Sequence, residues 1–286
     1  MSHPELSRGD RGDDVKALQS ELNKVGAMLV CDGDFGRGTE RAVRYAQDFA
    51  GQPCTGTADI TLWAWLATQP EPFLPLPSDG VAFIAREETG GLAYYEQVTR
   101  WPHYPGAASG ITIGVGYDLR FNDADDFHHC WGPLLPAASL AALAEDLGRK
   151  GTSTRAKALR TLGVEVPFKA AWRVFIDRTL PRFYDETAAI YPSLPRLPPL
   201  CAAVLVSLVF NRGTSLKGAS RCEMRNIRDL LVVADDIGLH KQKRRVILAD
   251  VEDELVAMKR LWSPDSGLIR RRQAEANLWR EGLAGW

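Results

Sequence analysis

Hydrophobic residues before residue 68 recur three and four positions apart, which is typical of short amphipathic helices. The first helix is expected after Asp13 or Asp14, either of which can cap it. The second is expected after Gly38 and Thr39, and the third over residues 59–67. The apolar residues Val15, Leu18 and Leu22 share one face of the first helix. The second helix is predicted to turn Ala42, Val43, Ala46 and Phe49 inward, and the third has the apolar residues Ile60, Leu62, Trp63 and Leu66.

A proline-rich segment separates these helices from the rest of the chain. Residues 69–79 contain four prolines, and such a segment is stiff, extended and poorly suited to a helix or a central strand. We therefore predict a domain over residues 1–68, a linker over residues 69–79 and a second domain over residues 80–286.

The second domain begins with a predicted short helix over residues 81–88, which Gly90 and Gly91 end. Residues 111–119 are rich in β-branched side chains and predict one short bent strand. After residue 123 the pattern is mostly helical to the end of the chain. The predicted fold class is therefore α+β and mostly helical, with a small three-helix domain before a larger domain that carries a short β element.

Composition narrows the class of function. The chain has 286 residues, 45% hydrophobic residues and a formal net charge of −1, so we expect neither a nucleic acid nor an anionic membrane as its partner. The apolar run 201–210 predicts a buried central helix, because spanning a bilayer takes about 20 apolar residues. The first residues lack the pattern of a signal peptide, which leads us to expect synthesis in the cytoplasm.

The segment Ser109–Leu119 carries the candidate chemistry. Its three glycines weaken a strand unless something must approach the backbone closely, and it also holds the hydroxyl of Thr112 and the carboxylate of Asp118. Two further carboxylates, Glu87 and Glu88, lie upstream at the end of the predicted helix. Two carboxylates and a hydroxyl are the groups that a glycoside hydrolase needs.

The N-terminal region resembles the three-helix peptidoglycan-binding domain. That family implies a domain that holds the protein on the bacterial cell wall, and Asp32, Phe35 and Trp63 are the candidate wall-binding residues, although most motif positions are turn, cap or core positions. The resemblance rests on Gly9, Gly12, Val15, Leu18 and Gln19, on Asp32, Gly33, Phe35, Gly36, Thr39, Ala42 and Val43, and on Thr55, Gly56, Asp59 and Trp63.

The larger region resembles the lysozyme-like superfamily, near the phage muramidases of glycoside hydrolase family 24 and the pesticin-like branch. Four segments carry the resemblance in the family's order: residues 83–88, 112–116, 207–213 and 267–275. A wall-binding domain followed by such a domain is similar to a modular phage endolysin. The resemblance implies cleavage of the β-1,4 bond between N-acetylmuramic acid and N-acetylglucosamine, without a cofactor or a metal.

The resemblance also implies catalytic roles. Glu88 would be the general acid rather than its neighbour Glu87, because its four-residue step from Ile84 matches the family's spacing. Thr112 would hold the attacking water and Asp118 would orient or deprotonate it, which is the inverting route with carboxyl groups roughly 6.5–9.5 Å apart. The common family form has an aspartate before the threonine, where this chain has Gly106, and the pesticin-like branch has one after the strand, as Asp118 is here.

Other candidate residues have smaller roles. Tyr94, Trp101 and Tyr104 are candidates for stacking on sugar rings or for the core, and Asn211 is a candidate substrate or helix-end residue. Arg271 and Glu275 are expected to pair along a helix. Adjacent histidines in the run 126–130 diverge on a helix, so no metal is expected there. Cys31 and Cys54 flank turns of the small domain and are candidates for a disulfide.

Several functions stay open at this stage. The expected partner is peptidoglycan, and we expect a monomer that is made in a host cytoplasm, does not insert stably into a membrane and reaches the cell wall after release. The alternatives are a lytic transglycosylase, which uses one glutamate, a cell-wall-binding protein with an inactive lysozyme-like domain, and an antibacterial effector with the same chemistry.

Overall fold

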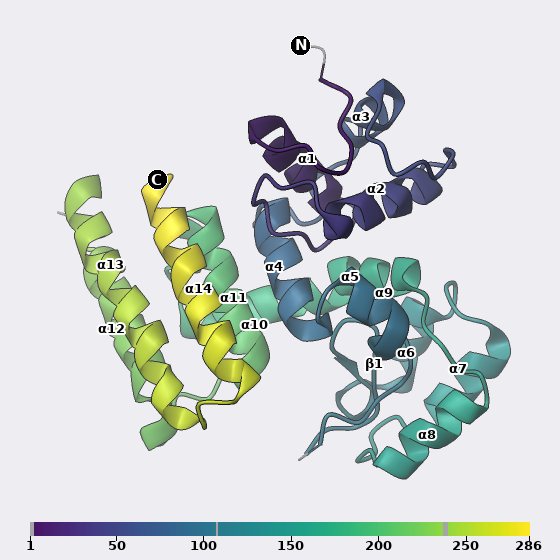
Figure 1. Cartoon of the computed structure of the whole chain (residues 1–286). Helices are drawn as coiled ribbons and strands as arrows, with labels where there is room; N and C mark the ends of the chain where they lie inside the picture. The colour runs from purple at the N-terminus through teal and green to yellow at the C-terminus, as the bar shows by residue number, and fades with distance from the viewer. Residues whose placement is uncertain (1–2, 107, 237–239) are drawn as a thin grey trace. The chain divides into compact units, whose positions relative to one another are not determined.

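The computed structural model describes residues 3–106, 108–236 and 240–286. The chain is mostly helical, as predicted, and its one sheet in the described residues has two strands (Figure 1). It divides into two compact units, one of Met1–Pro72 with Ala85–Pro181 and one of Phe73–Ile84 with Arg182–Trp286. Among the helices that the structure describes, none is long and apolar enough to cross a membrane.

The three predicted N-terminal helices are present as α1 (Asp13–Asn23), α2 (Arg37–Phe49) and α3 (Ile60–Leu66). The predicted start of the second was wrong, because α2 begins at Arg37 and includes Gly38 and Thr39. Asp59 caps α3 by accepting a hydrogen bond from the Leu62 amide at 2.9 Å. The helices enclose one apolar cluster, because their inward residues follow the helical period. The cluster includes Val15, Leu18, Leu22, Phe35, Ala42, Val43, Ala46, Leu62, Trp63 and Leu66.

The predicted cap of α1 was wrong. Gly12 is the N-cap residue, with φ 121°, and it makes no side-chain capping hydrogen bond. Both aspartates instead occupy the first turn of the helix, where a negative charge is stabilised by the helix dipole. A glycine is favoured at the cap because this φ lies in the region that other residues rarely adopt.

Helix α4 (Ser78–Thr89) starts three residues earlier than predicted. Ser78 and Asp79 were expected in the linker, but they form its first turn, directly after the last proline of the segment. The predicted end is confirmed, since Gly90 and Gly91 follow the helix with φ 78° and 89°. The domain split at residues 68 and 80 stays a prediction.

The prediction of one bent strand over residues 111–119 was wrong. The segment forms an antiparallel hairpin of β1 (Thr112–Ile113) and β2 (Tyr117–Asp118), joined by a turn over residues 114–116. The turn forms because Gly114 and Gly116 have φ 57° and 71°, which a glycine adopts without steric cost.

Short helices precede and follow the hairpin along the chain, and they belong to the same unit. Those before it are α5 (Leu92–Tyr94) and the π-helical turn η1 (Tyr95–Thr99). Those after it are η2 (Leu119–Phe121), α6 (Ala124–Trp131), α7 (Ala137–Ala144), α8 (Ser153–Thr161), α9 (Phe168–Val174) and the π-helical turn η3 (Phe175–Thr179).

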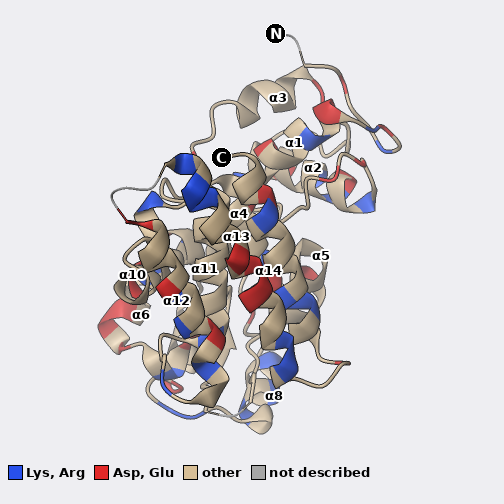
Figure 2. Cartoon of the chain, turned by 90° about the vertical axis from the view of Figure 1, so that its left-hand side faces the viewer, with Lys and Arg blue, Asp and Glu red and all other residues tan. Residues whose placement is uncertain are grey.

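The second unit contains longer helices around a buried central one. The run 201–210 was predicted as that helix and is confirmed within α11 (Pro199–Arg212), whose residues from Cys201 to Val209 are all buried. Lys and Arg occur together with Asp and Glu along α12, α13 and α14 (Figure 2). The other elements are α10 (Leu180–Ile190), η4 (Leu194–Arg196), η5 (Ala219–Arg221), α12 (Cys222–Ala234), α13 (Lys241–Ala257), η6 (Met258–Leu261) and α14 (Gly267–Ala284).

A buried charge network joins α11 to α14. Glu275 is fully buried, and its Oε1 accepts hydrogen bonds from Ser207 at 2.7 Å and Arg272 at 2.9 Å. Arg271 Nε lies 3.3 Å from the same oxygen, which confirms the predicted pairing along α14. Buried charges are tolerated only when they are paired in this way, so the network fixes how the two helices align.

Replacing Glu275 with Ala should destabilise the second unit. Two arginines would be left buried without their carboxylate, which costs roughly 3–5 kcal/mol in the free energy of unfolding. Urea unfolding followed by circular dichroism measures this change. Glu281→Ala is the matched control, because Glu281 is exposed on the same helix; equal stability losses in both variants would contradict the importance of the network.

Candidate functional site

The hairpin separates polar from apolar side chains on its two faces. Ile113 and Tyr117 are paired across the hairpin and buried, and the Tyr117 ring packs edge-on against Trp131 at 5.5 Å between centroids. Thr112 and Asp118 form the neighbouring pair. Because successive side chains alternate between the faces of a strand, Thr112 and Asp118 share the face opposite this core.

A third backbone segment pairs with the hairpin beside its two strands, and it was not predicted from the sequence. His103 forms an isolated antiparallel bridge with Thr112, in which the Thr112 amide donates to the His103 carbonyl at 2.8 Å and the reverse bond is 3.0 Å. Thr112 is therefore the central member of a row made of His103, Thr112 and Asp118. An isolated bridge at one residue produces no alternating pattern in the sequence, so only the backbone pairing in the structure reveals this neighbour.

The carboxylate of Asp118 is held by backbone amides. Gly110 N–H lies 3.0 Å from each of its two oxygens, and the Arg120 amide donates to Oδ1 at 2.9 Å. Because it accepts the hydrogen bond from the Arg120 amide, Asp118 is also the N-cap residue of η2. The side chain thus fastens the start of the hairpin segment to its end, whatever chemistry it also performs.

The backbone at Gly110 is enclosed by a second glycine. The Gly151 amide donates to the Ser109 carbonyl at 3.0 Å, and a Cβ on Gly151 would lie 2.6 Å from the carbonyl carbon of Gly110. No side chain fits in that space. The glycines of this segment predicted that something approaches its backbone closely. In the structure, the loop that precedes α8 makes this approach, and it belongs to the same unit.

Glu88 lies in the last turn of α4 and is half-buried, as is Glu87. One carboxylate oxygen of Glu88, Oε1, is shielded from solvent. The next residue, Thr89, is buried and its hydroxyl donates to the Ala85 carbonyl at 2.7 Å, which anchors the helix end. Glu88 therefore combines a fixed backbone with a partly shielded carboxyl group.

The predicted sugar-stacking residues of the first unit differ in exposure. Tyr94 is half exposed, and its ring packs against Gly90, two residues after Glu88. A Cβ atom on Gly90 would lie only 2.9 Å from Cδ1 of the Tyr94 ring. Trp101 is half-buried, and the guanidinium groups of Arg100 and Arg160 lie 5.5 Å and 5.0 Å from its ring centroid. Tyr104 is half-buried.

The fourth candidate, Asn211, belongs to the second unit. It lies in the last turn of α11, and its side-chain oxygen accepts a hydrogen bond from Arg272 at 3.3 Å. Asn211 thus extends the buried charge network around Glu275. This contact accounts for the residue structurally, and its role in substrate binding stays a prediction.

The candidate wall-binding residues have unequal access to solvent. Phe35 is 1% exposed and Trp63 is 4% exposed, so both rings are core residues of the three-helix cluster. Asp32 is exposed and shapes the turn before α2, since its Oδ1 accepts from Gln19 at 2.8 Å and from the Asp34 amide at 2.9 Å. Its turn lines a cavity of about 310 Å³.

Cys31 and Cys54 do not form the predicted candidate disulfide. All five cysteines are thiols in the structure, and Cys54 is exposed. Cys31 Sγ instead accepts a contact from the Asn23 side chain at 3.6 Å. The small domain is therefore held together by its apolar cluster and its turn hydrogen bonds.

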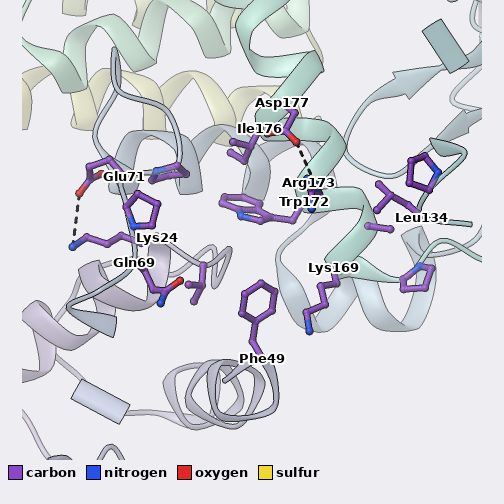
Figure 3. Close-up of a pocket in the computed structure, with 16 residues that line it drawn as sticks. Lys24, Phe49, Gln69, Glu71, Leu134, Lys169, Trp172, Arg173, Ile176 and Asp177 are labelled. Atoms are coloured by element: carbon purple, nitrogen blue, oxygen red, sulfur yellow. Dashed lines mark ion pairs between the residues drawn. The ribbon is translucent and has the colours of Figure 1, made fainter. Parts of the chain in front are cut away.

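A larger cavity of about 670 Å³ lies elsewhere in the first unit (Figure 3). Phe49 and Trp172 are aromatic lining residues, and the predicted catalytic residues are not part of the lining. Charged side chains at its edge form two ion pairs, Lys24 with Glu71 at 3.9 Å and Arg173 with Asp177 at 3.4 Å. The candidate chemistry at the hairpin therefore does not use this cavity.

Comparison with known proteins identifies the first part of the chain. A family model described as a peptidoglycan binding domain matches residues 11–66, which cover α1 to α3. No curated protein matches the chain. Residues 11–66 therefore match a peptidoglycan-binding domain, and this match supports association of the protein with the cell wall.

Replacing Gly151 with Ala should destabilise the hairpin. The added methyl group would overlap the backbone at Gly110, and such overpacking costs about 1–3 kcal/mol. Thermal unfolding followed by circular dichroism measures the loss. Gly38→Ala is the control, since its Cβ would meet nothing closer than 3.8 Å; a Gly151 variant as stable as this control would show that the loop can move away.

Proposed function

We propose that the protein is a peptidoglycan hydrolase of the lysozyme type, which cleaves the β-1,4 bond between N-acetylmuramic acid and N-acetylglucosamine. The observation that carries the proposal is the direct pairing of Thr112, which is 6% exposed, with the half-buried Asp118 across the hairpin. A hydroxyl beside a carboxylate is suited to holding and activating one water molecule. The peptidoglycan-binding domain supports the same substrate.

In the proposed reaction, Glu88 gives its proton to the oxygen of the leaving N-acetylglucosamine as the glycosidic bond breaks. A water held by the Thr112 hydroxyl attacks the anomeric carbon of N-acetylmuramic acid, and Asp118 takes the proton that this water releases. Attack by water from the opposite face inverts the configuration. The amides of Gly110 and Arg120 would hold Asp118 in a fixed orientation toward the water.

A lytic transglycosylase is the second candidate, and one observation favours it. Three amide contacts occupy the Asp118 carboxylate, which suits a structural role and would leave Glu88 as the single catalytic carboxyl group. In that reaction the 6-hydroxyl of muramic acid replaces water as the nucleophile. The product would then carry a 1,6-anhydro end instead of a reducing end.

We further propose that the protein is a phage endolysin, because its peptidoglycan-binding domain precedes the proposed lysozyme-like region. Such a protein would be synthesised in a host cytoplasm and act on the cell wall as a monomer. An antibacterial effector would use the same chemistry. The site of action follows from the substrate, because peptidoglycan lies outside the cytoplasmic membrane.

Replacing Glu88 with Gln should abolish lysis while leaving the fold intact. Loss of a general acid lowers a rate by roughly 10²–10⁴-fold, and Glu87→Gln is the matched control because both side chains are half-buried at the same helix end. Mass spectrometry of the fragments released from purified peptidoglycan measures both the rate and the product.

Reducing muramic-acid ends support the proposed hydrolase, and 1,6-anhydro ends support the transglycosylase instead. Equal activity of Glu88→Gln and wild-type protein would remove Glu88 from the mechanism. If wild-type protein releases no fragments, the conclusion is that it is a wall-binding protein without hydrolase activity.

A further inference from the structure

His103, Thr112 and Asp118 form one row across three adjacent backbone segments. His103 and Thr112 exchange two backbone hydrogen bonds, and Thr112 pairs directly with Asp118 in the hairpin. Residues directly opposite each other in antiparallel pairs point to the same face, with Cβ atoms roughly 5 Å apart. An imidazole, a hydroxyl and a carboxylate therefore share the face opposite Ile113 and Tyr117.

Burial and charge set the protonation of His103. Burial lowers the pKa of its imidazole, and the Trp101 carbonyl and the negative charge of Asp118 raise it by less, so the net pKa lies below the ordinary value. The ring is therefore neutral at neutral pH. Its Nδ1 lies 3.4 Å from the Trp101 carbonyl; when Nδ1 carries the proton, Nε2 is the acceptor of the ring.

Other charged groups near this row are engaged elsewhere. The guanidinium groups of Arg100 and Arg160 lie over the Trp101 ring, at 5.5 and 5.0 Å. The Arg120 side chain donates to the Ala108 carbonyl. Among the described residues, Asp118 is thus the charged group whose effect on His103 is resolved.

We propose that His103 is a positioning residue of this site, which acts through Asp118. The inference rests on the proposed function. With a neutral imidazole, the Asp118 carboxylate keeps its full negative charge for the water held by Thr112. A protonated imidazole would place a positive charge on the same face, offset the negative charge of Asp118 at that water and lower the rate.

The pH dependence of activity tests this role. Wild-type activity, measured as ends released from purified peptidoglycan, should fall toward acid pH as His103 takes up a proton. His103→Gln cannot take up that proton, so its acid limb should move to lower pH. At neutral pH it should stay within about tenfold of wild type, because it is not the general acid, whose loss costs roughly 10²–10⁴-fold.

The control is His129→Gln, because His129 is an exposed histidine on α6 of the same unit; it should keep the wild-type profile. An acid limb of His103→Gln that coincides with that of wild type would overturn the inference alone. A wild-type protein that releases no ends would instead overturn the proposed function.

A second readout does not depend on activity. In an NMR titration of the His103 ring protons, Asp118→Asn should lower the titration midpoint, because it removes the negative charge that raises the pKa of His103. The amide of asparagine keeps an oxygen to accept the Gly110 and Arg120 amide bonds. The same midpoint in both proteins would show that His103 and Asp118 are not coupled, and would overturn the inference.

The burial that lowers the pKa of His103 should also make the stability of the protein depend on pH. The folded pKa of His103 is below its unfolded value, so the unfolded chain binds a proton first as the pH falls. Stability should therefore decrease as the pH falls from about 6.5, the ordinary histidine value, through the folded pKa. His103→Gln should lose this part of the pH dependence in urea unfolding, and an unchanged slope would contradict the burial of a neutral imidazole.

Discussion

The hydrogen bonds from the amides of Gly110 and Arg120 to the Asp118 carboxylate are the contacts on which the candidate site depends. They tie the two ends of the segment together, so the two-residue strands need not be stable by themselves. A hairpin of this length has too few backbone pairs to persist in water. The carboxylate and the buried Ile113 and Tyr117 make it a fixed support for Thr112.

The same contacts limit what Asp118 can do. A carboxylate has room for about four hydrogen bonds, so three amide contacts still leave capacity for a water molecule. A group held by backbone amides cannot rotate away from the water that it must activate. The structural and the proposed chemical roles of Asp118 are therefore compatible, and they require the charge of the carboxylate to stay available, which is where His103 acts.

Helices were predictable from the sequence because a helix depends on contacts three and four residues apart. The buried residues of α1 to α3 and the buried run in α11 follow from that period, but Phe49, predicted to face inward, is only half-buried, and the apolar Ile60 is exposed. The single strand was wrong because two paired residues are too few for an alternating pattern, although the positive φ at Gly114 and Gly116 is what closely spaced glycines permit. The pairing of Arg271 with Glu275 was predictable for the same local reason.

Contacts between distant residues were not predictable. Ser207 reaches Glu275 across 68 positions, and the bridge of His103 with Thr112 needs a loop that returns to the same backbone edge. Such contacts depend on where packing places each segment, and no local pattern encodes them. The sequence thus predicted Thr112 and Asp118 from their chemistry, but it could not predict the environment that limits what chemistry they can perform. A half-buried imidazole on one side of Thr112 and an amide-held carboxylate on the other are the two groups through which we expect this site to respond to pH.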